Sequence, residues 1–383
     1  MQLLALNRDI LHDLSKFIIS SQDLGHLTST SRAAYEIFIP ALYRDVSVSK
    51  ERNAAEFCSS LLSHPQHIHL LRTLKCITHD FRSLSTSYPN DLTNVLFRAN
   101  NLQALQLTSV GFFAEASNFI PALIQLKQLQ SLSLSEITSE QCRALLPRLS
   151  PGHLRNIKLD IREELPDVLR LLQHFSPSLE DLTLLFPVYW GREFWCSPVE
   201  IDPSMYWPRV HTLSLIFVYM SRPDMLSQIF PNVRCLDIFG QPCEARNGWT
   251  PQGTVWRNLK ALEINSFSLA SQIIDWKGTG AIDGLFFSEH WLAMNTADFD
   301  ESPISSIHAM LASSRPKSLL LQIHRKLAAP VCTLLQELAP DLDFLALSIR
   351  SFNVAETVLD EAVSCRRVSP FLPPLTANPS ETR

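Results

Sequence analysis

The fold is decided by a six-residue pattern that reads LQALQL at residues 102–107. The pattern returns as LQSLSL at residues 129–134, LRNIKL at 154–159 and LEDLTL at 179–184. Positions one, four and six are apolar. Because side chains alternate along a strand, the last two apolar residues share one face and the polar residue between them lies on the other. The pattern therefore predicts a series of short strands, each with one buried side.

Further copies extend this pattern along most of the chain. Clear copies are Val210-Leu213-Leu215, Val233-Leu236-Ile238, Leu259-Leu262-Ile264 and Leu342-Leu345-Leu347. Weaker copies are Leu71-Leu74-Cys76, Ile282-Leu285-Phe287 and Pro316-Leu319-Leu321. The copies start 23 to 34 residues apart, and most spacings fall near the roughly 20–29 residues of leucine-rich repeats. The chain thus resembles the leucine-rich-repeat family over residues 68–350.

The segments between the predicted strands favour helices. Thr138 and Gln141 have the spacing of a capping box in front of an apolar run. The resemblance implies an irregular α/β solenoid, with parallel strands on the concave side and helices on the convex side. One departure is that the family often has Asn in the turn after the strand, whereas Val110 and Ile137 stand at two of these positions. The turns must therefore satisfy their backbone groups in another way.

The first 46 residues break the repeat and favour short amphipathic helices. The residues that define the pattern of this segment are Leu6, Asp9, Ile10, Leu11, Phe17, Ile18, Asp23, Leu24, Leu27, Arg32, Pro40, Leu42 and Tyr43. In these residues the segment resembles the F-box. The later Ser63-His64-Pro65 and Leu71-Arg72-Thr73-Leu74 resemble the junction in F-box proteins abundant in mushroom-forming fungi. Asn7 stands where the family has Pro, and Ser31 where it has Cys. An Asn can cap a helix start, so we expect Asn7 to replace the Pro without harm.

The F-box resemblance implies a substrate-recognition subunit of an SCF-type (Skp-cullin-F-box) E3 ubiquitin ligase complex. The partners would be a Skp-type adaptor, through it a cullin, and an unidentified protein substrate held by the repeats. The resemblance implies these adaptor-binding residues: Leu6, Ile10, Leu11, Phe17, Leu24, Leu27, Leu42 and Tyr43. The alternative is a leucine-rich-repeat scaffold with no ligase role, whose N-terminal helices only cap the array.

Two groups of residues are candidates for binding the substrate. Lys75, Lys158, Asp237 and Glu263 lie between the apolar strand positions and should face the concave side. Aromatic residues follow Phe186, and Trp190, Trp195 and Trp207 are candidate interface anchors, although packing on the solenoid is the favoured interpretation of these aromatic residues. The alternatives are ordinary solvation of a sheet face for the first group and packing on the solenoid for the second.

Composition excludes several classes of function. A net charge of −5 and a pI near 6.2 argue against nucleic acid and anionic membranes as partners. No apolar window has the length of a membrane span or signal peptide. The eight cysteines are scattered, which is typical of reduced thiols in the cytoplasm or nucleus.

We expect no catalytic residue, no cofactor and no metal site. His64, His67 and His69 lie close together but lack metal-ligand spacing. A rival interpretation is a hydrolase with its site in loops 187–207 and 240–256. The predicted domains are the helical module at 1–46, a linker helix at 47–67, the solenoid at 68–350, a C-terminal capping helix at 351–366 and a disordered tail at 367–383.

Overall fold

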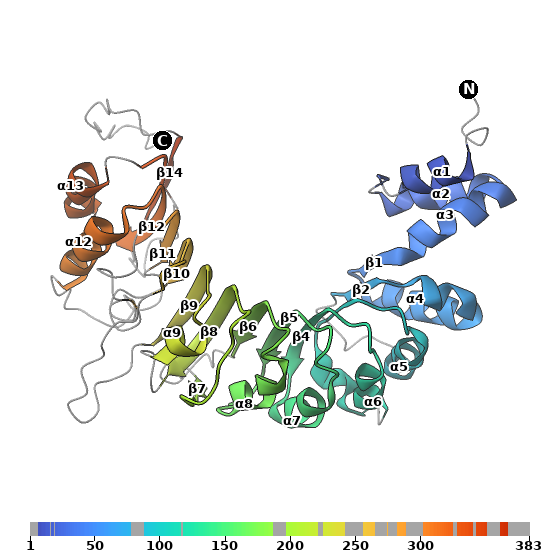
Figure 1. The fold of residues 1–383 in the computed structure, drawn as a ribbon. Coiled ribbons are helices and arrows are strands. Elements are labelled where there is room, and N and C mark those ends of the chain that lie inside the picture. Colours follow the sequence, from blue (N-terminus) through green and yellow to red (C-terminus); the bar gives the residue numbers. More distant parts are fainter. Residues whose placement is uncertain are drawn as a thin grey trace, which may run out of the picture. The chain divides into compact units, whose positions relative to one another are not determined.

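The protein is an α/β chain built on parallel sheets, as seen in a computed structural model (Figure 1). The structure describes residues 7–15, 17–18, 20–77, 88–115, 118–186, 197–220, 225–241, 256–264, 274, 282–288, 302–324, 328–339, 342–350 and 361–366. Leu6, Trp190, Trp195, the predicted tail and most of the two loops of the hydrolase interpretation lie outside these residues. The chain divides into two compact units, residues 1–187 and 188–383, and each is described by itself.

The first unit begins with three short helices, as the sequence predicts. They are α1 (Arg8–Ser15), α2 (Ser21–Thr30) and α3 (Arg32–Arg44). The side chains of Ser20 and Ser31 cap α2 and α3, and the Asn7 side chain accepts a hydrogen bond from Asp9 N at 3.0 Å. The expected capping role of Asn7 is therefore confirmed. Leu11, Leu24, Ala34 and Phe38 form the small core between the helices.

Six parallel strands follow in the first unit. They are β1 (Asp45–Val48), β2 (Thr73–Cys76), β3 (Ala104–Leu107), β4 (Ser131–Ile137), β5 (Asn156–Ile161) and β6 (Asp181–Leu185). Equivalent apolar positions pair in register from strand to strand, as in the row Leu74, Leu105, Leu132, Ile157 and Leu182. All five are buried, so the six-residue pattern sets both the strands and their register.

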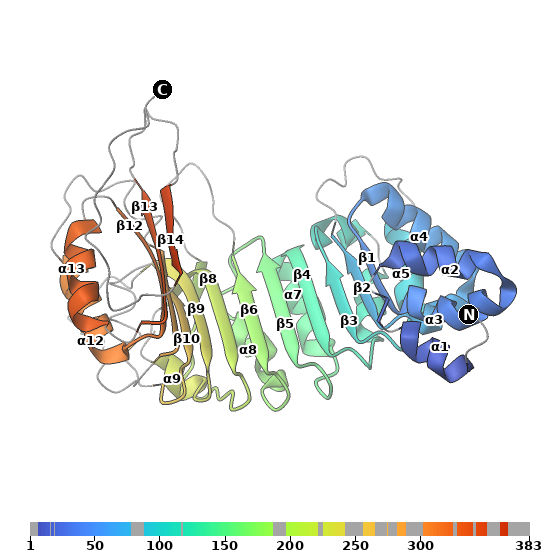
Figure 2. The same cartoon turned by 90° about the horizontal axis from the view of Figure 1, so that it is seen from above.

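Helices return the chain between these strands. The described ones are α4 (Glu51–Ser63), η2 (Pro65–Leu70), α5 (Tyr88–Arg98), η4 (Val110–Glu115), α6 (Phe119–Ile124), α7 (Ser139–Leu145), η5 (Leu146–Arg148), α8 (Val168–Leu172) and η6 (Gln173–Phe175). They line one face of the sheet, whereas no described helix lies over the other (Figures 1 and 2). We call this other face the open face of the unit.

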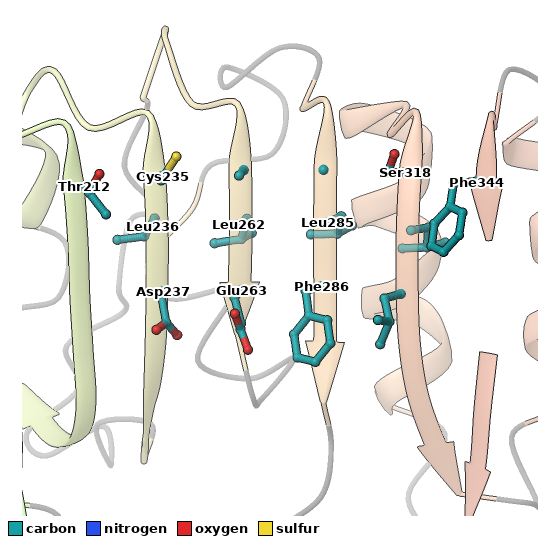
Figure 3. Close-up of a pocket in the computed structure, with 14 residues that line it drawn as sticks. Thr212, Cys235, Leu236, Asp237, Leu262, Glu263, Leu285, Phe286, Ser318 and Phe344 are labelled. Atoms are coloured by element: carbon teal, nitrogen blue, oxygen red, sulfur yellow. The ribbon is translucent and has the colours of Figure 1, made fainter. Parts of the chain in front are cut away.

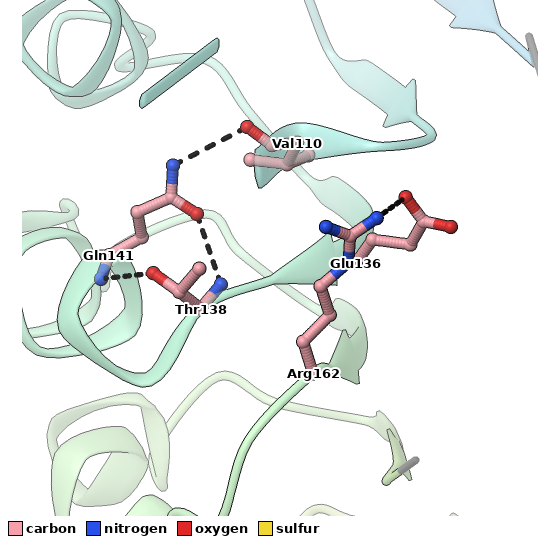
Figure 4. Close-up of polar contacts among 5 residues, drawn as sticks. All are labelled: Val110, Glu136, Thr138, Gln141 and Arg162. Carbon is pink, nitrogen blue, oxygen red and sulfur yellow. Dashed lines mark hydrogen bonds and ion pairs between the residues drawn. The ribbon is translucent and has the colours of Figure 1, made fainter. Parts of the chain in front are cut away.

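Gln141 shows how one turn satisfies its backbone without an Asn (Figure 4). Thr138 and Gln141 form the predicted capping box, with bonds of 3.2 Å to the Thr138 hydroxyl and 3.0 Å to the Gln141 amide oxygen. The Gln141 amide nitrogen also donates to the carbonyl of Val110, 3.4 Å away. Arg162 pairs with Glu136 beside this turn, and Glu136 has a positive φ of 60°.

The second unit repeats this architecture. Its strands are β7 (Ser197–Val199), β8 (Thr212–Met220), β9 (Cys235–Gln241), β10 (Ala261–Ile264), β11 (Gly284–Ser288), β12 (Ser318–His324), β13 (Phe344–Arg350) and β14 (Glu361–Arg366). Its described helices are α9 (Leu226–Ile229), α12 (Ser302–Ser314) and α13 (Ala328–Leu338). Strands β8 to β13 pair in parallel with their apolar positions in register. The weaker copies at 282 and 316 are thus strands of the same sheet.

Two predicted domain boundaries need correction. The linker segment 47–67 begins inside β1, so the sheet starts at Asp45 and not at residue 68. The segment 351–366 is not a helix throughout, because residues 361–366 form β14, which pairs antiparallel with β13. A physical reason is that an unpaired sheet edge exposes a row of backbone donors and acceptors, which a further strand satisfies.

Candidate protein-binding surfaces

Helix α1 and the turn after it carry large apolar side chains at the surface. Ile10, Leu14 and Phe17 are 50%, 40% and 78% exposed. Their spacing of four and three residues puts them on one side of a helical turn, and Phe17 N still donates to Leu14 O at 3.0 Å. A Phe this exposed gains nothing from the fold, because burial is what makes an apolar side chain stabilising. We call these three residues the α1 apolar stripe.

The structure separates the predicted adaptor-binding residues into two groups. Ile10 and Phe17 belong to the α1 apolar stripe. Leu11 and Leu24 are buried in the helical core, with Leu27 and Leu42 packed against it. Leu11 and Leu24 therefore hold the helices together and support the α1 apolar stripe from inside the module. Leu14 was left out of the predicted set, although its i, i+4 spacing from Ile10 could have identified it.

Tyr43 also has an internal role. Its ring stacks on His67 with ring centroids 4.7 Å apart, and the Nε2 atom of His67 lies 3.1 Å from the Tyr35 hydroxyl. His64 also stacks on His67. This aromatic and histidine cluster joins α3 to η2. Burial, and then the nearby His64, lower the pKa of His67, so the imidazole is held in its neutral form.

The open face of the first unit is polar. Lys75, Gln106, Ser133, Lys158 and Thr183 stand in one row across neighbouring strands β2 to β6. Lys75 and Lys158 are exposed, as expected. Three strand spacings separate them, about 14 Å at roughly 4.8 Å each, so they do not form one cationic site. Asp160, also on β5, has its pKa raised by burial and by Glu136.

The open face of the second unit brings two predicted residues together. Asp237 on β9 and Glu263 on β10 are neighbours in the strand register. Asp237 accepts a hydrogen bond of 2.6 Å from the Ser214 hydroxyl. Burial raises the pKa of both carboxyls, and the charge of Asp237 raises that of Glu263 further. Groups with raised pKa in a hollow are typical of functional surfaces.

These carboxylates lie at one end of a hollow of about 330 Å³. Figure 3 shows Asp237, Glu263 and Phe286 in one row, and Thr212, Cys235, Ser318 and Phe344 in a second row. The full lining is Thr212, Cys235, Leu236, Asp237, Ala261, Leu262, Glu263, Gly284, Leu285, Phe286, Ser318, Leu319, Leu320 and Phe344. Sequence reasoning named the acidic part and missed the apolar part, Phe286, Leu320 and Phe344. We call this hollow the acidic-apolar strip.

The structure contradicts a role of Trp207 as an exposed substrate anchor. The side chain is fully buried, and its ring stacks on Phe230 with centroids 5.8 Å apart. Trp256 is buried in the same region and donates from Nε1 to the Phe230 carbonyl at 3.0 Å. The sequence left two interpretations of Trp207, an interface anchor or packing on the array, and the structure agrees with packing.

Two other kinds of feature, a metal site and a membrane-spanning helix, are absent from the described part of the chain. It holds no group of three or more His, Cys, Asp or Glu side chains that could hold a metal ion. None of its helices is both long and apolar enough to cross a bilayer. No protein-family model matches the sequence, and no curated protein matches it either. The class is thus set by the fold alone: an α/β protein with parallel sheets and two candidate binding surfaces.

Proposed function

We propose that the chain is an F-box protein with leucine-rich repeats and that it serves as the substrate-recognition subunit of an SCF-type E3 ubiquitin ligase. The observation that carries the proposal is the α1 apolar stripe on a helical module placed before a repeated strand–helix array. The module binds a Skp-type adaptor and through it a cullin. The chain itself is not catalytic, because its partners carry out ubiquitin transfer.

The repeat interpretation is supported by how the two units are built. Each apolar triplet pairs in register with the next one, and the position between its last two members stays on the open face, where it is polar from β2 to β10 and apolar at Phe286 and Leu320. A single unit of this kind cannot bury its apolar face, whereas stacked units can. An array with an exposed polar face is suited to holding another protein, which supports an irregular leucine-rich-repeat solenoid as the substrate-binding part.

The docking role is supported by the contrast between neighbouring residues of α1. Leu11 is 1% exposed and fixes the helix in the module. Ile10 and Phe17 point their apolar surface to solvent. A module that only capped the repeats would bury such residues against them. Exposed clusters of large apolar side chains mark protein interaction sites, so the stripe is assigned to the adaptor.

A pull-down with a purified Skp-type adaptor tests the proposal. The substitutions Ile10→Asp and Phe17→Asp each place a charge in the α1 apolar stripe without disturbing the core. We expect either variant to lose binding to the adaptor. Ser59→Asp is the matched control, since Ser59 is exposed on α4. The wild-type chain could fail to retain the adaptor, or the Ile10→Asp and Phe17→Asp variants could retain it as well as the wild type does. Either result would favour the alternative of a repeat scaffold without a ligase role. The proposed compartment is the cytoplasm or the nucleus.

A further inference from the structure

The acidic-apolar strip runs across six neighbouring strands of the second unit. Its lining comes from β8, β9, β10, β11, β12 and β13. Five strand spacings of about 4.8 Å make a strip about 24 Å long. This length is more than a compact small molecule spans, and it matches a segment of polypeptide of about seven extended residues.

One end of the strip carries uncompensated negative charge. Among the described residues, Asp237 and Glu263 have no ion-pair partner, and the charge of Asp237 opposes ionisation of Glu263. Like charges on directly opposed strand positions destabilise a sheet. A bound cation would relieve this repulsion, and the partial burial of Asp237 would strengthen the attraction.

The other end is apolar and hollow. Phe286, Leu320 and Phe344 line it, and Phe344 is 39% exposed. Between the two ends, Gly284 leaves an opening in the floor: a Cβ atom added there would meet nothing within 4 Å. The space above Gly284 therefore exists because this position has no side chain.

From this arrangement we infer that the strip binds a polypeptide segment in which a lysine or arginine lies three or four residues from a large apolar side chain. The cation pairs with Asp237 and Glu263, and the apolar side chain packs on Leu320 and Phe344. Two strand spacings separate Glu263 from Leu320 and three separate it from Phe344, about 10–14 Å, which an extended peptide covers in about three to four residues. The inference rests on the proposed function, because it names the chemistry of the substrate that the repeats would hold.

The first experiment selects ligands without assuming a substrate. A phage library of random twelve-residue peptides is panned on the immobilised full chain, with counter-selection on the Asp237→Asn/Glu263→Gln double variant. We expect enrichment of peptides with one Lys or Arg and one large apolar residue three or four positions away. Failure to enrich such peptides, or enrichment without a basic residue, overturns the inference.

The second experiment measures the contribution of charge. An enriched lysine peptide, labelled with fluorescein, is titrated with the full chain and followed by fluorescence anisotropy. Acetylation of its lysine, or the Asp237→Asn/Glu263→Gln double substitution, is expected to weaken binding about tenfold or more. Glu337→Gln is the matched control, because Glu337 is exposed on α13 and outside the strip. Equal weakening by the control, or none by the double variant, contradicts the inference.

A third variant tests the hollow itself. Gly284→Leu adds a side chain into open space, so the fold should keep its melting temperature while peptide binding falls at least tenfold. Retained binding by a folded Gly284→Leu chain contradicts the assignment. Adaptor retention is measured on the same variants and should be unchanged. Failure of the wild-type chain to retain the adaptor would thus count against the proposed ligase function. Failure of the wild-type chain to bind such peptides, with the adaptor retained, would count against this inference alone.

Discussion

The Gln141 side chain donates a hydrogen bond to the carbonyl of Val110 across 3.4 Å. Val110 lies in the turn after β3, and the Gln141 side chain reaches it from α7, the helix that follows the next strand. The same amide closes the capping box with Thr138. One glutamine thereby ties two successive turns together.

The hydrogen bonds of Gln141 to Val110 and Thr138 predict that truncation of the Gln141 side chain lowers the stability of the fold. Gln141→Ala should lower the free energy of unfolding by about 1–3 kcal/mol, because it removes a cap and leaves buried polar groups without a partner. Urea denaturation measures the change. Glu140→Gln, at the exposed neighbouring position, is the control and should cost less than about 1 kcal/mol. A Gln141→Ala chain as stable as the control would show that these hydrogen bonds are unimportant.

Substitutions in the core and at the surface of α1 and the turn after it should differ in their effect on stability in the same assay. Leu11→Ala is expected to destabilise the chain by about 2–5 kcal/mol, since Leu11 is 1% exposed in a small core. Phe17→Asp should change stability by less than about 0.5 kcal/mol, because Phe17 is 78% exposed. A large loss for Phe17→Asp would mean that this side chain supports the fold and is not free to bind.

His67 predicts a dependence of stability on pH. Its pKa is lowered in the folded chain, first by burial and then by His64, whereas the unfolded imidazole titrates near about 6.5. Below that pH the unfolded state binds the extra proton, so stability falls as the pH drops. The midpoints of urea unfolding at pH 7.5 and 5.5 measure this loss of stability. The loss should be smaller in the His67→Phe variant.

His69→Gln is the control for this experiment, since His69 is exposed in the same 3-10 helix. His174 contributes in the same sense, because burial lowers its pKa too, and for that reason His67→Phe should leave some of the dependence in place. If the wild type and the His67→Phe variant showed the same pH dependence of stability, its assignment to His67 would be contradicted.

Asp237 predicts a stabilising substitution. Burial raises its pKa in the folded state, so ionisation costs stability as the pH rises through the acid range, and the ionised form is the less stable one at neutral pH. Asp237→Asn removes that cost and the repulsion with Glu263 while it keeps an oxygen that can accept from Ser214. We expect a gain of up to about 1 kcal/mol at pH 7.

The gain from Asp237→Asn should shrink as the pH falls and the wild-type carboxyl becomes protonated. Thermal unfolding at pH 7 and pH 4 tests this trend. A variant less stable than the wild type at pH 7 would mean that the carboxylate serves the fold and is not held there for binding.

The strands were largely predictable from the sequence, because the apolar triplets carry both position and register. Strand β1 was missed for a physical reason. Its triplet is Tyr43, Val46 and Val48, with the hydroxyl-bearing Tyr at the first position, where the other copies have a residue without a polar side-chain group. Strand β14 was missed because it depends on pairing with β13, a contact distant in sequence.

The candidate surfaces were only partly predictable. Asp237 and Glu263 were identified because their position in the pattern puts them on the open face. The hollow beside them depends on Gly284 and on Phe344, from strands far apart in the sequence. The buried state of Trp207 could not be predicted from aromatic content, since packing against Phe230 decides it.

Binding of the full chain to a purified Skp-type adaptor, measured by isothermal titration calorimetry, tests the central claim most directly. The account predicts saturable binding with one adaptor per chain, lost in Phe17→Asp and preserved in Ser59→Asp. No measurable binding by the folded wild-type chain, or equal binding by the wild type and Phe17→Asp, would contradict it.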